Sequence, residues 1–349
     1  MILIALHIAL SLCLLASVLS VFIPASVLPV PAWFGLAFEW LMAAEVLVGF
    51  VLLCSRHRRW CWLTLVMLLL CVAPIGYTVS HQALIFPKKV LPHSFTLMSY
   101  NTHLMGDVRK PKQNRVIQYI LRAQPDVVCL QEVEVSKSSD NLTLAELREA
   151  LSVYPYTYFD FKIYNSRRQY GNAVFSRYPL IDKHTLRYES RGNITSVCNI
   201  VLPDDTLRLY TNHLESNRLQ HKDIDLGTTT ESAQSALQGT SAKLEKASEI
   251  RIRQAQAIHD DAQRSPYPVL IVGDMNTTPV SYTYRILQKG MRDAFLESSN
   301  GRLGHTFVKR GIGVRIDYIL HSSALSASDF DVPHVDYSDH YPVIATIHY

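Results

Sequence analysis

The first quarter of the chain consists mainly of apolar positions with very few polar interruptions. Three apolar runs occupy residues 2–23, 32–54 and 60–79. By subtraction of their ends they contain 22, 23 and 20 residues. A hydrocarbon core of about 30 Å needs roughly 20 helical residues, so each run is long enough to cross a bilayer. The pattern predicts a membrane segment with three transmembrane helices in residues 1–87.

The first of these runs has a second interpretation, a cleaved signal peptide, which small residues near Ala25 and Ser26 favour. However, no basic residue precedes the run. Its length also exceeds the ~7–15 apolar residues of an ordinary signal core. We therefore expect the run to remain in the protein as a membrane helix.

Basic residues between the runs predict the orientation of the membrane segment. Residues 56–59 contain three arginines and form the only strongly basic short loop, and such loops stay on the cytoplasmic side. Three crossings then place the amino terminus inside and everything after Val79 outside. Lys88 and Lys89 weigh mildly against this orientation. We expect a multi-pass protein of the plasma (inner) membrane with residues 88–349 extracytoplasmic.

Glu39 and Glu45 are the only charged residues inside the three apolar runs. An intramembrane functional pair is one interpretation, because ionisable groups are costly in a bilayer. Their spacing of six residues puts them on opposite sides of a helix. This favours separate packing or interfacial roles.

Beyond residue 87 the pattern changes to short apolar strands separated by polar loops and amphipathic helices. β-Branched and aromatic runs predict strands at 95–100, 126–131, 173–176, 193–202, 207–211, 269–272, 315–320 and 342–348. Helical spacing predicts helices at 114–122, 142–151 and 245–263. Residues 225–242 are rich in Ser, Thr and Gln, which is typical of a flexible insertion. The pattern predicts one α/β domain over residues 88–349.

Composition agrees with two parts of different character. The mean hydropathy of +0.07 is high for a soluble enzyme, and only five of the 64 charged residues precede Lys88. From Lys88 onward, 31 Lys and Arg face 28 Asp and Glu, a net charge of +3. This charge is modest for a protein that tracks a nucleic-acid backbone. With 48% hydrophobic residues, 14 Gly and 6 Cys, collagen-like, disordered and disulfide-framework classes are excluded.

Polar side chains stand at or near the ends of several predicted strands. A turn or packing role explains any one of them. Strand ends at the rim of a sheet are also where ligand sites form, and apolar runs ending in an acid occur three times. Repeated acids of this kind indicate carboxylates that converge on a hard cation such as Mg²⁺. The residues are Asn101, Glu132, His213, Asp274, Asn276, Asp317, Asp339 and His340.

The motifs around these residues resemble the endonuclease/exonuclease/phosphatase superfamily, which has the deoxyribonuclease-I-like fold. The resemblance implies a four-layered α/β sandwich, two mixed β-sheets flanked by helices, in a membrane-anchored protein of bacterial type. It also implies hydrolysis of a phosphate ester with Mg²⁺ or Mn²⁺. The matching runs are SYN at 99–101, LQE at 130–132, YGNAVFS at 170–176, NHL at 212–214, GDMN at 273–276, RIDY at 315–318 and SDH at 338–340.

The resemblance implies roles for these residues, beginning with the metal. Glu132 is the expected metal ligand, with Asn101 beside it and Asp339 sharing or replacing a ligand. Asp274 is expected to orient or deprotonate the attacking water. The general base is either this aspartate or His340, and the sequence leaves the choice open.

The other implied roles concern the phosphate. Asn276 is expected to donate to a phosphate oxygen as charge builds on it. His340 and His213 are expected to flank the phosphate, with Asp317 holding His340 through its other ring nitrogen. The two candidates that contact either the substrate or the rest of the protein are Tyr170 and Arg315.

A shared fold fixes the type of reaction rather than the substrate. The first hypothesis is a membrane-tethered phosphodiesterase or phosphatase that acts on an envelope phosphoester, such as a phospholipid or phosphorylated glycan. The second is a cell-surface nuclease that cleaves DNA or RNA. The third is a non-catalytic membrane protein that uses the fold as a binding module. The intact metal and water-handling positions argue against the third.

Overall fold

The computed structural model describes residues 1–80, 91–105, 111–137, 142–163, 168–186, 188, 193–217, 230–299, 303–309 and 311–349. The chain forms two compact units. The first contains residues 1–79, 216–255 and 277–286, and the second contains residues 80–215, 256–276 and 287–349. Each unit is built from separate stretches of sequence.

The N-terminal apolar runs form a helical bundle in the first unit. Its helices are α1 (Ile2–Leu19), α2 (Val30–Leu36), α3 (Phe38–Leu53), η1 (Arg58–Trp60), α4 (Cys61–Leu70) and α5 (Val72–Thr78). Within the described residues, only α1 is by itself long and apolar enough to cross a membrane. The chain bends by 77° between α2 and α3, and by 57° between α4 and α5. One continuous spanning helix is therefore found where three were predicted.

The break between α4 and α5 has a cause in the sequence. Pro74 lies in the first turn of α5. Its ring lacks an N–H and clashes with the carbonyl four residues earlier, that of Leu70, so a helix cannot continue undisturbed through this point. A prediction from hydropathy alone misses the break, because proline does not interrupt the apolar pattern.

Glu45 takes part in helix packing inside this bundle. It is fully buried, and its Oε1 atom lies 2.9 Å from Nε2 of His7 and accepts a 3.0 Å hydrogen bond from Ser11. The same His7 nitrogen lies 2.8 Å from Oγ1 of Thr64. These contacts join α1 to α3 and α4, which agrees with a packing role rather than a pair with Glu39.

Helix α10 (Thr230–Ala262) is longer than the helix predicted at 245–263. The part of the predicted flexible insertion that the structure describes, residues 230–242, is helical, so that prediction was wrong there; residues 225–229 lie outside the described residues. Within the first unit, the indole N–H of Trp33 donates to Ser241 at 3.3 Å. Tertiary contact of this kind stabilises a helix whose polar composition resembles that of a loop.

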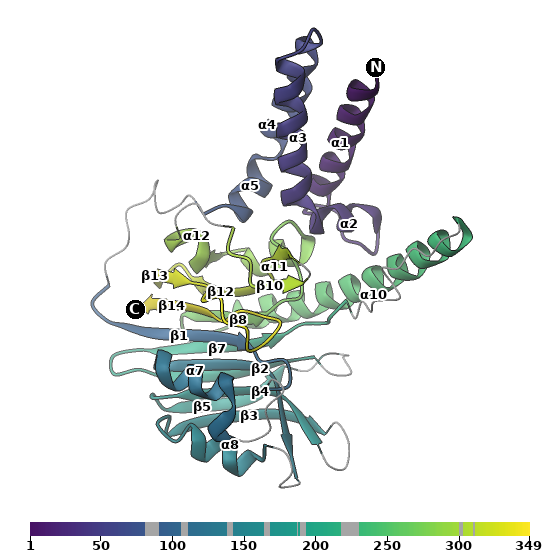
Figure 1. The fold of residues 1–349 in the computed structure, drawn as a ribbon. Helices are drawn as coiled ribbons and strands as arrows, with labels where there is room; N and C mark the ends of the chain where they lie inside the picture. The colour runs from purple at the N-terminus through teal and green to yellow at the C-terminus, as the bar shows by residue number, and fades with distance from the viewer. Residues whose placement is uncertain are drawn as a thin grey trace. The chain divides into compact units, whose positions relative to one another are not determined.

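The second unit contains two mixed six-stranded sheets (Figure 1). The first has the order β13-β14-β1-β2-β4-β3 and the second the order β5-β6-β7-β8-β12-β9. Strands of the first sheet are β1 (Ser94–Asn101), β2 (Val127–Ser136), β3 (Tyr156–Ile163), β4 (Arg168–Ser176), β13 (Ser326–Asp331) and β14 (Val343–His348). Strands of the second are β5 (Leu180–Leu186), β6 (Ile194–Val201), β7 (Thr206–His213), β8 (Val269–Asp274), β9 (Met291–Asp293) and β12 (Asp317–Ser322).

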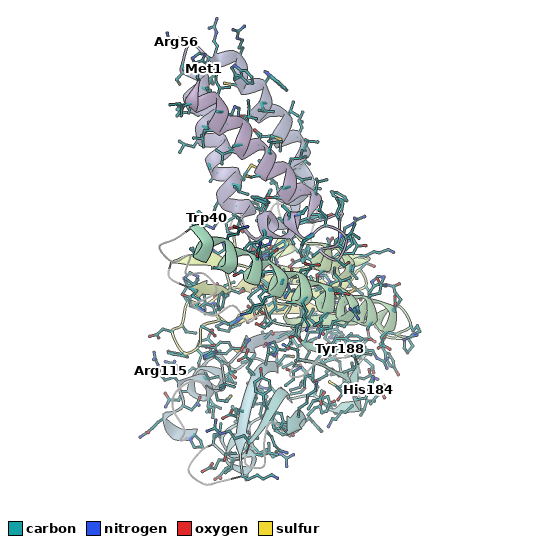
Figure 2. All side chains as sticks on the ribbon, turned by 90° about the vertical axis from the view of Figure 1, so that its right-hand side faces the viewer. Met1, Trp40, Arg56, Arg115, His184 and Tyr188 are labelled. Atoms are coloured by element: carbon teal, nitrogen blue, oxygen red, sulfur yellow. The ribbon has the colours of Figure 1, made fainter. Side chains whose placement is uncertain are left out.

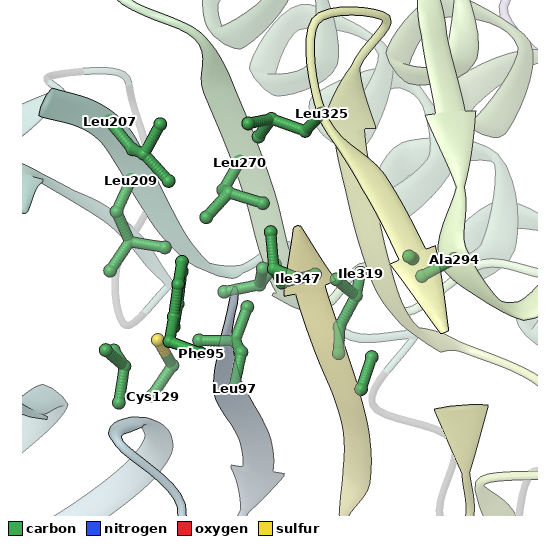
Figure 3. Packing of buried hydrophobic residues seen from close by; sticks show 14 of the residues in the cluster. Phe95, Leu97, Cys129, Leu207, Leu209, Leu270, Ala294, Ile319, Leu325 and Ile347 are labelled. Carbon is green, nitrogen blue, oxygen red and sulfur yellow. The ribbon is translucent and has the colours of Figure 1, made fainter. Parts of the chain in front are cut away.

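Apolar side chains from both sheets form the core between them. Figure 3 shows Phe95, Leu97 and Cys129 of the first sheet packed near residues of the second sheet such as Leu209 and Leu270. All of these side chains are buried. Burial on this scale is the main favourable term that holds two sheets face to face.

Helices cover the outer faces of the sheets. α7 (Arg115–Ala123) and α8 (Leu144–Ala150) bury apolar residues against the first sheet, as Figure 1 shows. The carboxyl-terminal part of α10 meets the second sheet, where Tyr210 donates a 2.7 Å hydrogen bond to Asp261. The remaining elements are η2 (Pro111–Gln113), α11 (Tyr282–Gln288), α12 (Ala294–Ser298) and the hairpin β10 (Phe307–Lys309) with β11 (Ile312–Val314). The predicted α/β sandwich is confirmed.

Candidate active site

Strand pairing brings the candidate residues to one end of the sandwich. β1 runs parallel to β2, with Asn101 opposite Gln131 just before Glu132. β7 runs parallel to β8, with His213 opposite Asp274. Because parallel strands end at the same edge of a sheet, these side chains leave the strands together.

An acid–imidazole–acid chain forms the centre of the site. Oδ2 of Asp317, the first residue of β12, accepts a 2.9 Å hydrogen bond from Nδ1 of His340. Nε2 of the same histidine lies 3.7 Å from Oδ2 of Asp274. All three side chains are buried. The contact with Asp317 fixes a proton on Nδ1 and leaves Nε2 facing the second acid.

Two asparagines hold Asp274 in place. Asn101 donates to Oδ2 of this acid at 2.9 Å. The backbone N–H of Asn276 donates to Oδ1 at 2.8 Å, and its side-chain amide donates to Oδ2 at 3.2 Å and to the Leu214 carbonyl at 3.0 Å. Both amide hydrogens of Asn276 are therefore engaged, which supports a positioning role and not the predicted donation to a phosphate oxygen.

His213 lies on the other side of Asp274. Its Nδ1 atom is 3.3 Å from the Tyr170 hydroxyl. Its Nε2 atom lies 3.4 Å from Oε1 of Glu132 and 3.9 Å from Oδ2 of Asp274. This nitrogen is buried and makes no hydrogen bond to any described residue. A buried donor of this kind is costly to leave unmatched, so it marks a position where a ligand oxygen is favoured.

A second group of acidic side chains lies at the more exposed side of the site. Asn101 donates to Oε1 of Glu132 at 3.3 Å. Nδ1 of His103 lies 3.8 Å from Oε2 of Glu132 and 3.4 Å from Oδ1 of Asp339. Ser338, beside Asp339, donates a 2.8 Å hydrogen bond to the Asn101 carbonyl. These contacts bring the three predicted metal-site residues into one group.

Burial and neighbouring charges shift the pKa values of the titratable groups in the site. Burial lowers the pKa of His340, but the charges of Asp317 and Asp274 outweigh it and raise the value to about 10. Burial raises the pKa of Asp274 and of Glu132. Burial lowers the pKa of His213. The pKa values of the two histidines are thus shifted in opposite directions, which favours a cationic His340 and a neutral His213.

The backbone is strained where the site is built. Glu132 and Asn276 have left-handed φ values of 53° and 50°, a conformation that costs energy for residues other than glycine. Gly273 has φ of 124°, and a Cβ added there would lie 2.1 Å from the Asn212 carbonyl oxygen. Glu132 lies inside β2, where the pairing with β4 shifts register between Leu130 and Val133, and Asn276 follows the end of β8.

Two groups in the site have the donor chemistry of a metal centre. Asp274, Asp317 and His340 each offer a ligand atom, and these atoms lie within 4.8 Å of one another. In that cluster, however, Asp317 and His340 are already hydrogen-bonded to each other. Glu132 and Asp339 offer carboxylate oxygens, the ligands that Mg²⁺ and Mn²⁺ prefer.

Comparison with known families now decides the classification. A model described as the Endonuclease/Exonuclease/phosphatase family matches residues 98–340. The chain belongs to this family. A second model, a domain of unknown function (DUF8431), matches residues 1–78. The endonuclease/exonuclease/phosphatase fold indicates a hydrolase of phosphoester bonds.

Solved structures of the endonuclease/exonuclease/phosphatase family have the same fold. A protein of this family from Beutenbergia cavernae DSM 12333 matches with a TM-score of 0.54 and 19% identity, over 74% of this chain and 72% of that chain. Truncated Caenorhabditis elegans TDP2 matches with a TM-score of 0.51 and 18% identity, over 73% of this chain and 98% of that chain. A protein of the family from Bacteroides thetaiotaomicron matches with a TM-score of 0.51 and 16% identity, over 75% of this chain and 96% of that chain. Curated protein sequences give no match.

Arg315 lies apart from the other candidates. Its guanidinium is buried and donates to Asp293 at 2.6 Å. It also lies 4.3 Å from the ring centroid of Phe295 and 4.8 Å from that of Tyr318. In this arrangement it packs inside the second unit, which agrees with the second of its two expected roles, a contact with the rest of the protein.

The structure adds residues that the motifs did not bring to attention. His103 lies beside Glu132 and Asp339, as described above, and its place two residues after Asn101 was the only signal in the sequence. The ring of Phe307 lies 4.9 Å from that of His340. Thr306 accepts hydrogen bonds from the backbone N–H groups of Ile316 and Asp317 at 3.0 and 3.1 Å. No pattern near residues 306–307 predicted this proximity.

Proposed function

We propose that the protein is a membrane-anchored, divalent-metal-dependent phosphoesterase. The observation that carries the proposal is the chain from Asp317 through His340 to Asp274, with the unmatched Nε2 of His213 beside it. A cationic imidazole on one side and a neutral imidazole donor on the other suit a phosphate group. Buried carboxylates between them suit the handling of a water molecule.

The residues present fit a divalent metal. Burial raises the pKa of Glu132 and outweighs the Asn101 amide, His340 and His103, which lower it; a bound cation would favour the charged carboxylate. Glu132 and Asp339 would hold the ion, and Asn101 would support Glu132 through its amide. When bound, Mg²⁺ or Mn²⁺ would supply charge stabilisation to the phosphoryl oxygens.

The remaining residues have separate tasks in this proposal. Asp274, whose burial makes it a stronger base than an ordinary aspartate, accepts a proton from the attacking water. His340 is protonated at neutral pH and donates from Nε2 to the phosphate or the leaving group. Asn276 positions Asp274. The directions of the two pKa shifts therefore favour Asp274 over His340 as the general base.

His213 is the second phosphate donor in the proposal. If the Tyr170 hydroxyl donates to Nδ1, the neutral ring carries its proton on Nε2, the atom without a protein partner among the described residues. Tyr170 is thus a positioning residue that selects the tautomer. Neutral histidine is favoured here because burial lowers its pKa.

The membrane part of the proposal rests on the helices of the first unit. α1 alone is suited to cross a bilayer, and the two bent pairs provide two more crossings if each acts as one span. In Figure 2, Met1 and Arg56 lie at one end of the bundle and Trp40 at the other. Arginines on the cytoplasmic side and an exposed tryptophan at the opposite interface support an inner-membrane protein whose catalytic residues are extracytoplasmic.

A membrane-anchored hydrolase meets envelope phosphoesters at high local concentration. We propose a phospholipid or another envelope-bound phosphoester as substrate, in preference to DNA or RNA. The modest net charge of +3 from Lys88 onward supports this choice over a nuclease. The nuclease remains the second candidate because the family description includes nucleases.

The test is an activity screen of the purified full-length protein in detergent micelles with Mg²⁺ or Mn²⁺. Its substrates are phospholipids, phosphosugars, DNA and RNA, and His340→Ala is the inactive control. Faster hydrolysis of an envelope phosphoester than of nucleic acid supports the proposal. Efficient cleavage of DNA or RNA alone would favour the nuclease.

A further inference from the structure

A pocket in the first unit lies at the end of α1 opposite Met1. It is lined by the end of α1 and the loop that follows, by α2, by α10, and by the segment directly after Asn276. These elements bring together hydroxyl, apolar and basic side chains. Residues that represent them are Ser20, Ile23, Leu36, Ser248, Arg251 and Thr278.

Arg251 gives the pocket a positive charge. Its side chain is only 5% exposed although it lies on a largely polar helix. A guanidinium has five N–H donors, so it can hold an anionic group and keep a protein contact at the same time. The hydroxyl of Ser248 is a further hydrogen-bonding group in the lining, whereas the hydroxyls of Ser20 and Thr278 donate to backbone carbonyls. The guanidinium of Arg251 and the hydroxyl of Ser248 are donors that match the oxygen atoms of a phosphate.

A second arginine lies at the same end of α1. Arg285 donates to the Val21 carbonyl at 3.4 Å, and its guanidinium lies 4.9 Å from the centre of the Phe22 ring. The last turn of α1 carries no basic residue of its own. The basic groups near this end are therefore supplied by other parts of the first unit.

The length of α1 indicates the depth of the pocket in a bilayer. Its 18 residues rise about 27 Å, close to the thickness of a hydrocarbon core. Ser20 follows α1 directly and therefore lies at the level of the lipid headgroups. The loop beyond it exposes Val27 and Leu28, and Val30, the first residue of α2, is also exposed. These apolar groups are suited to the same boundary.

We propose that this pocket binds the phosphate of a membrane lipid headgroup, with the cationic side chain of Arg251 as its main anchor. Basic pockets between membrane helices at the level of the headgroups recognise lipid phosphates in this way. The lipid's acyl chains would lie along the exposed apolar faces of the bundle. This inference rests on the proposed membrane insertion of α1 and not on the proposed hydrolysis.

The test is native mass spectrometry of the full-length, delipidated protein in detergent. Dioleoyl phosphatidylglycerol is the probe, and galactosyl diacylglycerol is the matched lipid without phosphate. We expect wild type to bind the phospholipid, and Arg251→Gln to bind it about tenfold more weakly. Arg253→Gln, two positions along α10 at an exposed residue, should bind like wild type.

A second variant separates loss of the site from loss of the fold. Ser248→Leu fills the pocket without changing its charge and should also weaken binding of the phospholipid. Both variants should keep the wild-type melting temperature and the wild-type rate on a small water-soluble phosphodiester, because neither residue lies in the catalytic network. Equal phospholipid affinities for wild type and Arg251→Gln would overturn the proposal.

Two further results separate binding of a lipid phosphate from binding of free phosphate, and failure of the pocket from failure of membrane insertion. Inorganic phosphate should not displace the phospholipid at millimolar concentration; if it did, the pocket would be a site for free anions. Release of the full-length protein from membranes by alkaline carbonate would contradict membrane insertion. Retention in the membrane without phosphate-dependent lipid binding would contradict only the pocket.

Discussion

Asp317 and His340 form a 2.9 Å hydrogen bond that joins the two halves of the sandwich. Asp317 begins β12 in the second sheet, and His340 lies three residues before Val343, where β14 of the first sheet begins. The pair therefore forms only when both sheets have packed. This dependence links the chemistry of the site to the integrity of the fold.

The first prediction concerns this pair. Asp317→Asn removes the charge that does most to raise the pKa of His340, which is about 10 in the wild type. We expect the pKa of His340 to fall by at least one unit. One unit corresponds to a loss of about 1.4 kcal/mol of differential interaction between the two protonation states. The measurement is an NMR titration of the histidine ring in the metal-free protein.

Stability and kinetics supply the controls for this prediction. The folded-state pKa of His340 lies above its unfolded value of about 6.5, so its contribution to stability is present below that pH and is lost as the pH rises through about 10. The stability difference between wild type and Asp317→Asn should shrink over the same range. The double variant Asp317→Asn/His340→Ala should lose little more activity than His340→Ala alone. Multiplicative losses would contradict a joint role.

The second prediction concerns the metal. Glu132→Gln keeps the shape of the side chain but removes its negative charge, so turnover should fall by roughly three orders of magnitude or more with little loss of stability. Glu134→Gln, on the same strand and paired with Arg168, is the matched control and should remain active. A large fall in melting temperature for Glu132→Gln would instead indicate a structural residue.

Much of the candidate site was predictable from the sequence because its side chains stand at the ends of apolar runs. An apolar run followed by an acid can be recognised locally at Glu132 and at Asp274, although β2 continues past Glu132 to Ser136. The packing of the two sheets then brings the two positions together. The hydrogen-bond pattern was not predictable to the same degree. Asn276 was expected to face the phosphate, but its amide is engaged by Asp274 and Leu214, a contact between residues 62 positions apart.

The sequence pattern did not predict strands β5 and β9, because neither has a clear local signal. β5 exposes most of its side chains, so it lacks the apolar alternation of a half-buried strand. β9 has only three residues, yet it ends at Asp293, the partner of Arg315. Since this pairing depends on β9, the burial of Arg315 could not be predicted from the sequence around it.

The third prediction concerns the backbone at Gly273. Ala at this position has an unfavourable φ and places a Cβ 2.1 Å from the Asn212 carbonyl, so we expect a loss of roughly 3 kcal/mol in unfolding free energy. Gly290 also has positive φ, but a Cβ there meets nothing closer than 3.7 Å. Gly290→Ala should therefore cost only about 1 kcal/mol. Thermal denaturation of both variants measures the difference, and equal losses would argue against the steric clash.

The fourth prediction concerns orientation. The arginine-containing loop at residues 56–59 should be cytoplasmic, so a reporter fused after Ser80 should be active only if it functions outside the cytoplasm. A reporter fused after Arg59 should show the opposite behaviour. Activity of a cytoplasmic reporter at Ser80 would reverse the orientation without affecting the assignment of the catalytic residues.

The central claim is that this site hydrolyses phosphoesters with a divalent metal. The most direct test is the initial rate of the purified full-length protein on its best phosphoester substrate from the activity screen, measured with Mg²⁺, after EDTA treatment and after Mg²⁺ is restored. We predict that EDTA abolishes hydrolysis, that Mg²⁺ restores it, and that His340→Ala reduces the restored rate by at least about a thousandfold. Full activity in EDTA, or a wild-type rate for His340→Ala, would contradict the account.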